Sequence, residues 1–159
     1  MKKIFVAVLV ILSMIMLTGC KNETLEESKN KKTNTELNEK VSDISIKDSK
    51  IFEGLDILND NTLETKLGIN RNFVSEHAIG MNLYTYEPRL YIVVKPKEEN
   101  KEIVKKALDL YIDRAKGEAL EEDKSKFENV LKEEYNGYYI YIVSDDNESV
   151  YNQIKGYLK

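Results

Sequence analysis

The chain has 159 residues, a formal net charge of −4, one cysteine, one histidine and no tryptophan. This length allows one ordinary domain with a single core. One cysteine cannot close a disulfide within the chain. The acidic balance argues against a nucleic-acid partner and against a domain surface that binds anionic lipid.

The N-terminus has the pattern of a secretory signal. Lys2 and Lys3 precede an apolar run of 14 residues, Ile4 to Leu17, as in the positive and apolar regions of a signal peptide. The run is shorter than the roughly 20 apolar residues that a transmembrane helix needs. We therefore predict that residues 1–19 are a signal peptide.

The segment Leu17-Thr18-Gly19-Cys20 resembles the lipobox of bacterial lipoproteins. The resemblance implies cleavage between Gly19 and Cys20 and a diacylglyceryl group on the Cys20 thiol. Two acyl chains hold a protein stably on a bilayer. We expect a protein anchored to the cell membrane on its extracytoplasmic side, with the lipid bilayer as its partner through Cys20. The alternatives are an ordinary signal peptide with a chance cysteine and an uncleaved anchor.

Residues 20–47 are predicted to be the lipidated cysteine followed by a disordered polar tether. Six lysines and six acidic residues occur in 21–47, together with few large apolar residues. Such a composition cannot bury enough surface to offset the entropy of ordering. A flexible chain of this length reaches roughly 30 Å. A single α+β domain is expected over residues 48–159.

The first part of this domain is predicted to be helical. Ser49 can cap a helix whose apolar stripe is formed by Ile51, Phe52, Leu55 and Leu58. Asn59-Asp60-Asn61 breaks the pattern. A further short helix over Leu63 to Leu67 is expected to end at Gly68.

Two extended segments and a long helix are predicted next. Residues 78–86 and 89–96 alternate in character, and Pro88 and Pro96 punctuate their ends, which indicates a β-hairpin. From Asn100 the apolar spacing becomes helical, to about residue 119. The buried face of this helix is expected to consist of Val104, Leu108, Tyr111 and Ala115, with Ile103, Ala107 and Ala119 beside it.

Residues 125–135 are ambiguous between helix and strand. Ser125 with Glu128 matches a capping box, whereas Asn136-Gly137 favours a tight hairpin turn. We prefer a hairpin with strands near 129–135 and 138–144. A final helix, capped by Asp145 with Glu148, is expected to bury Val150, Tyr151, Ile154, Tyr157 and Leu158.

This order of elements predicts an α+β fold. Its core is ββαββα, preceded by a short helical segment. We expect an antiparallel sheet of about four strands with helices packed on it.

Two segments carry a resemblance to a known family. The lipobox and polar tether, combined with YIVVKPKEENKEIVKKALDLYIDRAK and NGYYIYIVSDD, are similar to domain-of-unknown-function family 4358, small lipoproteins of Gram-positive bacteria. The similarity covers most of residues 60–150. Arg114 matches the arginine at the end of the family's helix, and Gly137, Tyr139 and Asp145 match its glycine-aromatic strand. The resemblance implies a class of protein and no mechanism.

No residue pattern indicates catalysis or a metal. His77 is the only histidine and is interpreted as a loop residue before the first strand. No serine stands in a nucleophile motif, and Cys20 would be consumed by lipid. Residues 145–149 offer oxygen ligands but lack the spacing of a calcium loop, so we interpret them as a cap and turn. We expect no cofactor, no metal and no enzymatic activity.

The chain has ten tyrosines, and several of them lie in the predicted strands. Alternation places five on the face opposite the apolar core: Tyr84, Tyr86, Tyr91, Tyr139 and Tyr141. Tyrosine combines a large contact area with a polar tip, which suits a recognition surface. The alternative is that a helix covers this second face.

The leading functional hypothesis is a non-catalytic lipoprotein of the cell envelope that binds a protein or peptide through the tyrosine face. The second hypothesis is capture of a small ligand. The third is a hydrolase that uses carboxylates, since general acid and base groups are abundant in the chain.

Overall fold

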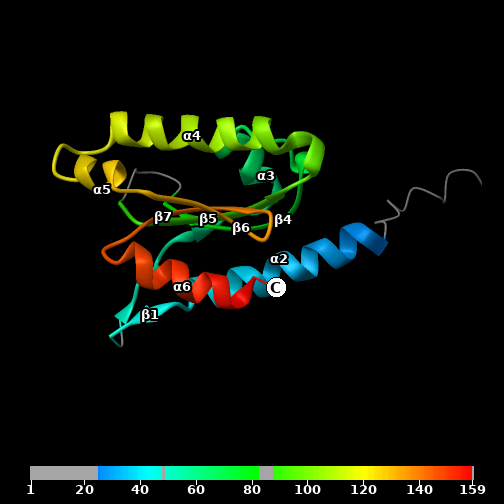
Figure 1. The fold of residues 1–159 in the computed structure, drawn as a ribbon, viewed down its shortest axis with the longest axis horizontal. Coiled ribbons are helices and arrows are strands. Elements are labelled where there is room, and N and C mark those ends of the chain that lie inside the picture. Colours follow the sequence, from blue (N-terminus) through cyan, green and yellow to red (C-terminus); the bar gives the residue numbers. More distant parts are fainter. Residues whose placement is uncertain (1–24, 48, 83–87, 159) are drawn as a thin grey trace, which may run out of the picture.

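The fold is a five-stranded antiparallel sheet between two layers of helices (Figure 1). The computed structural model describes residues 25–47, 49–82 and 88–158. The strand order is β3-β4-β5-β7-β6, and a separate two-stranded ribbon pairs β1 with β2. The strands are β1 (Ser45–Ile46), β2 (Ser49–Lys50), β3 (Asp56–Ile57), β4 (Val74–Met81), β5 (Leu90–Pro96), β6 (Leu131–Tyr135) and β7 (Tyr138–Val143).

Helices cover both faces of the sheet. In Figure 1, α4, α5 and α3 lie above the strands, while α2 and α6 lie below them. The helical elements are α2 (Leu25–Ser42), α3 (Asp60–Thr62), the π-helical turn η1 (Leu63–Leu67), the 3₁₀ turns η2 (Arg71–Phe73) and η3 (Glu98–Asn100), α4 (Lys101–Glu118), α5 (Lys124–Glu128) and α6 (Asn147–Tyr157).

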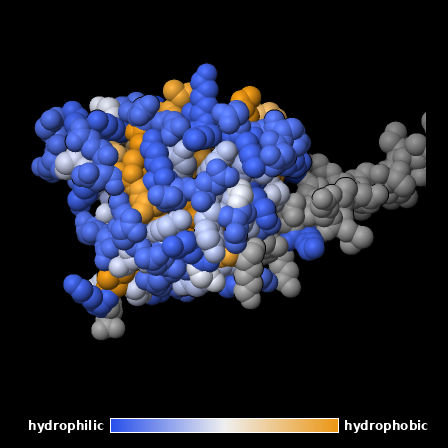
Figure 2. Space-filling model, in the orientation of Figure 1, coloured by the Kyte–Doolittle hydropathy of each residue, from blue (hydrophilic) through white to orange (hydrophobic). Residues whose placement is uncertain are grey.

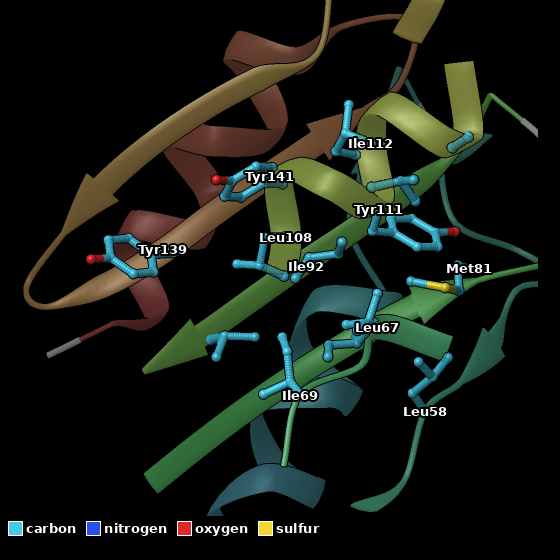
Figure 3. Packing of buried hydrophobic residues seen from close by; sticks show 14 of the residues in the cluster. Leu58, Leu67, Ile69, Met81, Ile92, Leu108, Tyr111, Ile112, Tyr139 and Tyr141 are labelled. Atoms are coloured by element: carbon cyan, nitrogen blue, oxygen red, sulfur yellow. The ribbon is translucent and has the colours of Figure 1, made fainter. Parts of the chain in front are cut away.

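The sheet separates two hydrophobic clusters. The first lies between the sheet and α4, where Ile92, Tyr139 and Tyr141 pack near Leu108 (Figure 3). The second lies between the sheet, α2 and α6, and contains Tyr91. Because both faces of the central strands are covered, β5 and β7 are nearly continuous apolar runs, as fully buried strands are.

The predicted α+β class with an antiparallel sheet is confirmed, with a fifth short strand, β3, added at one edge. Both predicted antiparallel pairings form, β4 with β5 and β6 with β7. Strand β4 runs from Val74 to Met81 rather than over 78–86, and residues 83–87 of the predicted first hairpin lie outside the described residues. The turn between β6 and β7 uses Asn136 and Gly137 at φ 51° and 78°, the positive values that a tight hairpin turn requires. The predicted long helix is α4, and its four expected core residues are buried.

Residues 125–135 divide between the two alternatives. Lys124–Glu128 is helix α5, which buries Phe127, and Leu131–Tyr135 is strand β6. The final helix is α6, but its cap is Asp146 rather than Asp145, because the Asp146 carboxylate accepts the backbone N–H of Ser149 at 3.1 Å.

The helix predicted from Ser49 is wrong. This region contains strand β2, a turn and strand β3. Phe52 packs in the cluster below the sheet, whereas Leu58 packs in the cluster above it. The chain must pass the sheet edge between these residues, and a single helical stripe cannot serve two opposite faces. The short helix expected over 63–67 does form, as η1, and Gly68 follows it with φ 67°.

The disordered tether predicted over 20–47 also differs from the structure. Residues 25–42 form α2, and Leu37, Val41 and Ile44 are buried against the sheet and α6. Leu37 and Val41 are four residues apart and share one face of α2, and Ile44 follows the end of the helix by two residues. The folded unit in the described residues therefore includes α2 and begins before residue 48. Residues 20–24 of the predicted tether lie outside the described part.

Candidate functional site

The edge of strand β4 is covered in an unusual way. Strand β3 pairs only with Gly80 and Met81, so the earlier part of β4 has no strand on that side among the described residues. Side chains of α2 accept the backbone hydrogen bonds of this part of β4 instead. Asn34 Oδ1 accepts the backbone N–H of His77 at 2.9 Å, and Asn38 Oδ1 accepts that of Ile79 at 3.0 Å. Helix α2 thus supplies the acceptors that a neighbouring strand would supply.

Asn38 connects this edge to the core. Its side chain is 5% exposed, and its Nδ2 donates to the Asn34 carbonyl at 3.0 Å. The Tyr91 hydroxyl donates to Asn38 Oδ1 at 3.4 Å. Burial raises the pKa of Tyr91, so this hydroxyl remains a donor. Asn38 therefore satisfies a strand edge and a buried hydroxyl together.

A cleft of about 310 Å³ opens along this edge, which we call the edge cleft. One wall is α2, the other is formed by β3 and the start of α3, and His77 of β4 lies between them. The volume is at the lower end of the range for small-molecule sites. The lining residues are Asn34, Thr35, Asn38, Glu39, Ile57, Leu58, Asn59, Asp60 and His77.

His77 occupies the middle of β4, so its interpretation as a loop residue is wrong. It is 3% exposed, and its Nε2 lies 3.0 Å from Asp60 Oδ1. A carboxylate can only accept, so Nε2 is the donor in this contact. Nδ1 is buried and has no hydrogen-bond partner among the described residues. The ring therefore holds the Asp60 carboxylate through Nε2.

The predicted tyrosine surface is wrong for the three tyrosines that the structure describes. Tyr91, Tyr139 and Tyr141 are all buried, and they do not share a face. Tyr91 lies opposite Ile142, whereas Tyr141 lies opposite Ile92. Directly paired residues point to the same side of a sheet, so Tyr139 and Tyr141 face α4 while Tyr91 faces α2. Tyr84 and Tyr86 lie outside the described residues.

The buried tyrosine hydroxyls tie the elements together. Tyr141 donates to Asp109 of α4 at 3.0 Å, and Tyr138 donates to Glu76 of β4 at 2.7 Å. Burial raises the pKa of both phenols, and the adjacent carboxylates raise it further. Desolvation opposes ionisation of Asp109, but hydrogen bonds from Lys132 and Tyr141 outweigh it and lower the pKa of this carboxyl. The tyrosines thus act as internal contacts.

The other predicted site residues have simpler outcomes. Cys20 and Gly19 lie outside the described residues, so lipidation stays a prediction. Within residues 25–47, 49–82 and 88–158, no three His, Cys, Asp or Glu side chains are grouped so that they could hold a metal ion.

Backbone and hydroxyl hydrogen bonds from Ser149 lower the pKa of Asp146, as expected for a helix cap. None of the helices in these ranges has the length and apolar character needed to cross a membrane.

The edge cleft was not predicted from the sequence. Its signal is the pair Asn34 and Asn38, which lie four residues apart and so share one face of a helix. That spacing becomes visible only when residues 25–42 are taken as helical. Asp60 gave no signal, because it was interpreted as part of a helix-breaking turn.

Residues that carry the family resemblance have structural roles here. Arg114 donates from Nη2 to the Lys66 carbonyl at 2.9 Å, which ties the end of α4 to η1. Gly137 provides the positive φ of the β6–β7 turn. Membership of the family stays a prediction. Compared with known proteins, the chain matches no family model, no curated protein and no solved structure.

Proposed function

We propose that the chain is a membrane-anchored extracytoplasmic lipoprotein whose folded domain is a non-catalytic module that binds a protein or peptide. The observation that carries the proposal is the edge cleft, which lies between α2 and β3 beside the part of β4 that pairs with no strand on that side among the described residues. Because Asn34 and Asn38 already accept the N–H groups of His77 and Ile79 on this edge, a peptide would bind the cleft through its side chains rather than as an added strand. The cleft replaces the tyrosine face as the binding surface.

The anchor part of the proposal rests on the sequence. A short apolar run ends in Leu17-Thr18-Gly19-Cys20, and the chain then turns polar. The similarity to family 4358 supports the same class of protein. The surface agrees with a domain in water, since the face in Figure 2 is mostly hydrophilic and its hydrophobic side chains form one narrow strip and a few small patches.

The geometry favours binding over catalysis. His77 donates to Asp60 through one nitrogen, and its other nitrogen is shielded from the cleft. Catalysis by this ring would require a free nitrogen within hydrogen-bond reach of a substrate. A wall of fixed polar groups beside an exposed isoleucine, Ile57, suits recognition instead.

A photo-crosslinker at Ile57 tests the peptide hypothesis. Ile57 is 49% exposed and lines the cleft, whereas Leu110 is 59% exposed on α4. In intact membranes, a crosslinker at Ile57 is expected to give a defined adduct, and one at Leu110 is not. The same adducts at both positions, or none at Ile57, would count against the cleft as a partner site.

The volume of the edge cleft favours a second candidate, capture of a small ligand. A metabolite that binds only the folded state raises the melting temperature by mass action, by about 2.7 kcal/mol of stability at a hundredfold excess over Kd. A thermal-shift screen is expected to identify such a compound if this candidate is correct. The shift should disappear when Ile57 is replaced with lysine, and its persistence would place the site elsewhere.

Replacing Cys20 with alanine is expected to abolish acylation and to leave the precursor uncleaved at Gly19. The thioether-forming group is removed, and the enzyme that cuts this class of signal requires the lipidated cysteine. Metabolic labelling with a radioactive fatty acid, followed by fractionation, measures the outcome. Ser13→Ala, within the apolar run, is the matched control and should keep the label. A labelled Cys20→Ala protein would contradict the anchor.

A further inference from the structure

The walls of the edge cleft carry negative charge. Glu39 of α2 lines one wall and Asp60 of α3 lines the other. No lysine or arginine is among the described residues that line it. Charges of one sign in a partly enclosed cleft concentrate ligands of the opposite sign. The cleft therefore favours a cation.

The carboxylate of Asp60 is held in place from inside the protein. His77, whose side chain is 4% exposed, contacts Oδ1 at 3.0 Å, while the other oxygen lies 3.9 Å from the Arg71 guanidinium. The second distance is too long for a hydrogen bond, and both Arg71 and Asp60 are partly exposed. Arg71 is the positive group beside this wall, and it offsets only part of the charge of Asp60 and Glu39.

Apolar atoms lie next to these carboxylates. Ile57 is 49% exposed at the mouth of the cleft, and Leu58 lies in its wall. A long basic side chain buries its methylene stem along apolar surface and keeps its charged head beside acceptors. A stem on Ile57 with its cation near Asp60 and Glu39 would use both features of the cleft.

We infer that the edge cleft recognises a basic side chain of the lysine or arginine type. This inference rests on the proposed function, because it specifies the chemistry of the partner that the cleft binds. A peptide with such a side chain places an ammonium or guanidinium group between the two acidic walls. Its binding weakens as salt is added, since partly exposed charges are screened.

Three blocked amino acids test the inference: Nα-acetyl-lysine methylamide, its norleucine counterpart with a four-carbon stem and no charge, and its glutamate counterpart with a shorter stem and the opposite charge. Each is titrated into the isotope-labelled full chain, and the backbone amide resonances of His77 and Ile79 report on the floor of the cleft. The lysine compound is expected to shift both resonances. The norleucine compound should bind roughly fivefold more weakly, and the glutamate compound more weakly still.

Variants that are expected to change lysine binding in opposite directions provide a second test. Asp60→Asn keeps an acceptor for His77 but removes the charge, and Glu39→Gln removes the other charge; each is expected to weaken lysine binding roughly fivefold. Arg71→Gln removes the competing cation and is expected to strengthen binding. Asp113→Asn, on the exposed surface of α4, changes the net charge equally and should have no effect.

The possible results separate the inference from the proposed function. Equal or tighter binding of the norleucine or glutamate compound would overturn the inference while leaving the cleft as a binding site. No shift with any of the three compounds would also overturn it. Failure of the proposed function itself would be recorded independently, by the absence of a specific crosslink at Ile57.

Discussion

Replacing Asn38 with alanine is expected to lower the free energy of unfolding by about 2–4 kcal/mol. The change leaves the buried N–H of Ile79 without its acceptor at 3.0 Å, and it also removes the acceptor of the Tyr91 hydroxyl. Each buried group without a partner costs about 1–3 kcal/mol. Chemical denaturation of the purified chain measures the loss, and amide hydrogen exchange at Ile79 measures release of the edge.

The matched control for this prediction is Lys40→Ala, an exposed position on the same helix. Its effect is expected to stay within about 0.5 kcal/mol. If α2 detaches before the rest of the domain unfolds, the Asn38 variant still exchanges the Ile79 amide faster. Unchanged stability together with unchanged exchange would show that α2 does not dock on β4, and would support the disordered tether instead.

Replacing Gly80 with alanine is expected to destabilise the protein by about 3 kcal/mol. A Cβ atom at this position would lie 2.3 Å from Cε1 of Tyr91 and 2.9 Å from its hydroxyl. The ring cannot move aside easily, because it is fully buried, packs edge-to-face on Phe52 at 4.8 Å and bonds Asn38. Thermal and chemical denaturation should both show the loss.

Two further variants identify the cause of the Gly80 effect. Gly156→Ala, in α6, meets nothing within 4 Å and should be neutral or stabilising by up to about 1 kcal/mol. Combining Gly80→Ala with Tyr91→Leu should cost less than the sum of the two single changes, since the smaller side chain relieves the clash. Strict additivity would mean that the Gly80 effect does not arise from the contact with Tyr91.

The parts of the fold that could be predicted have local signals. Helix α4 has apolar residues at helical spacing along its length, and the dipeptide Asn136-Gly137 is typical of a tight hairpin turn. These features depend on neighbours within a few residues, so the sequence pattern carries them. The preference for an antiparallel sheet followed from the two hairpins.

The predicted tyrosine face was wrong because alternation within one strand does not show which face of the sheet each set of residues occupies when both faces are covered. Within β5, Tyr91 and Ile92 alternate correctly, but the register with β7 pairs Tyr91 with Ile142 and not with another tyrosine. When both faces are buried, each strand can carry tyrosine on either side. Register is set by the whole sheet, and no single strand reveals it.

The wrong prediction of a disordered tether and the failure to predict the edge cleft have the same cause. The average composition of residues 21–47 is that of a disordered chain, but Leu37 and Val41 share one face of α2 with Asn34 and Asn38. A short stripe of this kind gains stability only from the surface that it contacts. That surface is the edge of β4 and the face beneath it, which are formed by residues more than thirty positions away.

On the proposed anchor, helix α2 would also shorten the free chain between the lipid and the sheet. Its N-terminal end projects beyond the sheet in Figure 1, and on the proposed anchor Cys20 precedes Leu25 by five positions. Five residues span at most about 18 Å, whereas a chain free through residue 47 could extend about 95 Å. A domain anchored at Cys20 with α2 docked would therefore stay in a shallower layer above the lipid than one on a free tether. On the proposed anchor, this confinement would raise the effective concentration of the edge cleft toward partners in the same membrane.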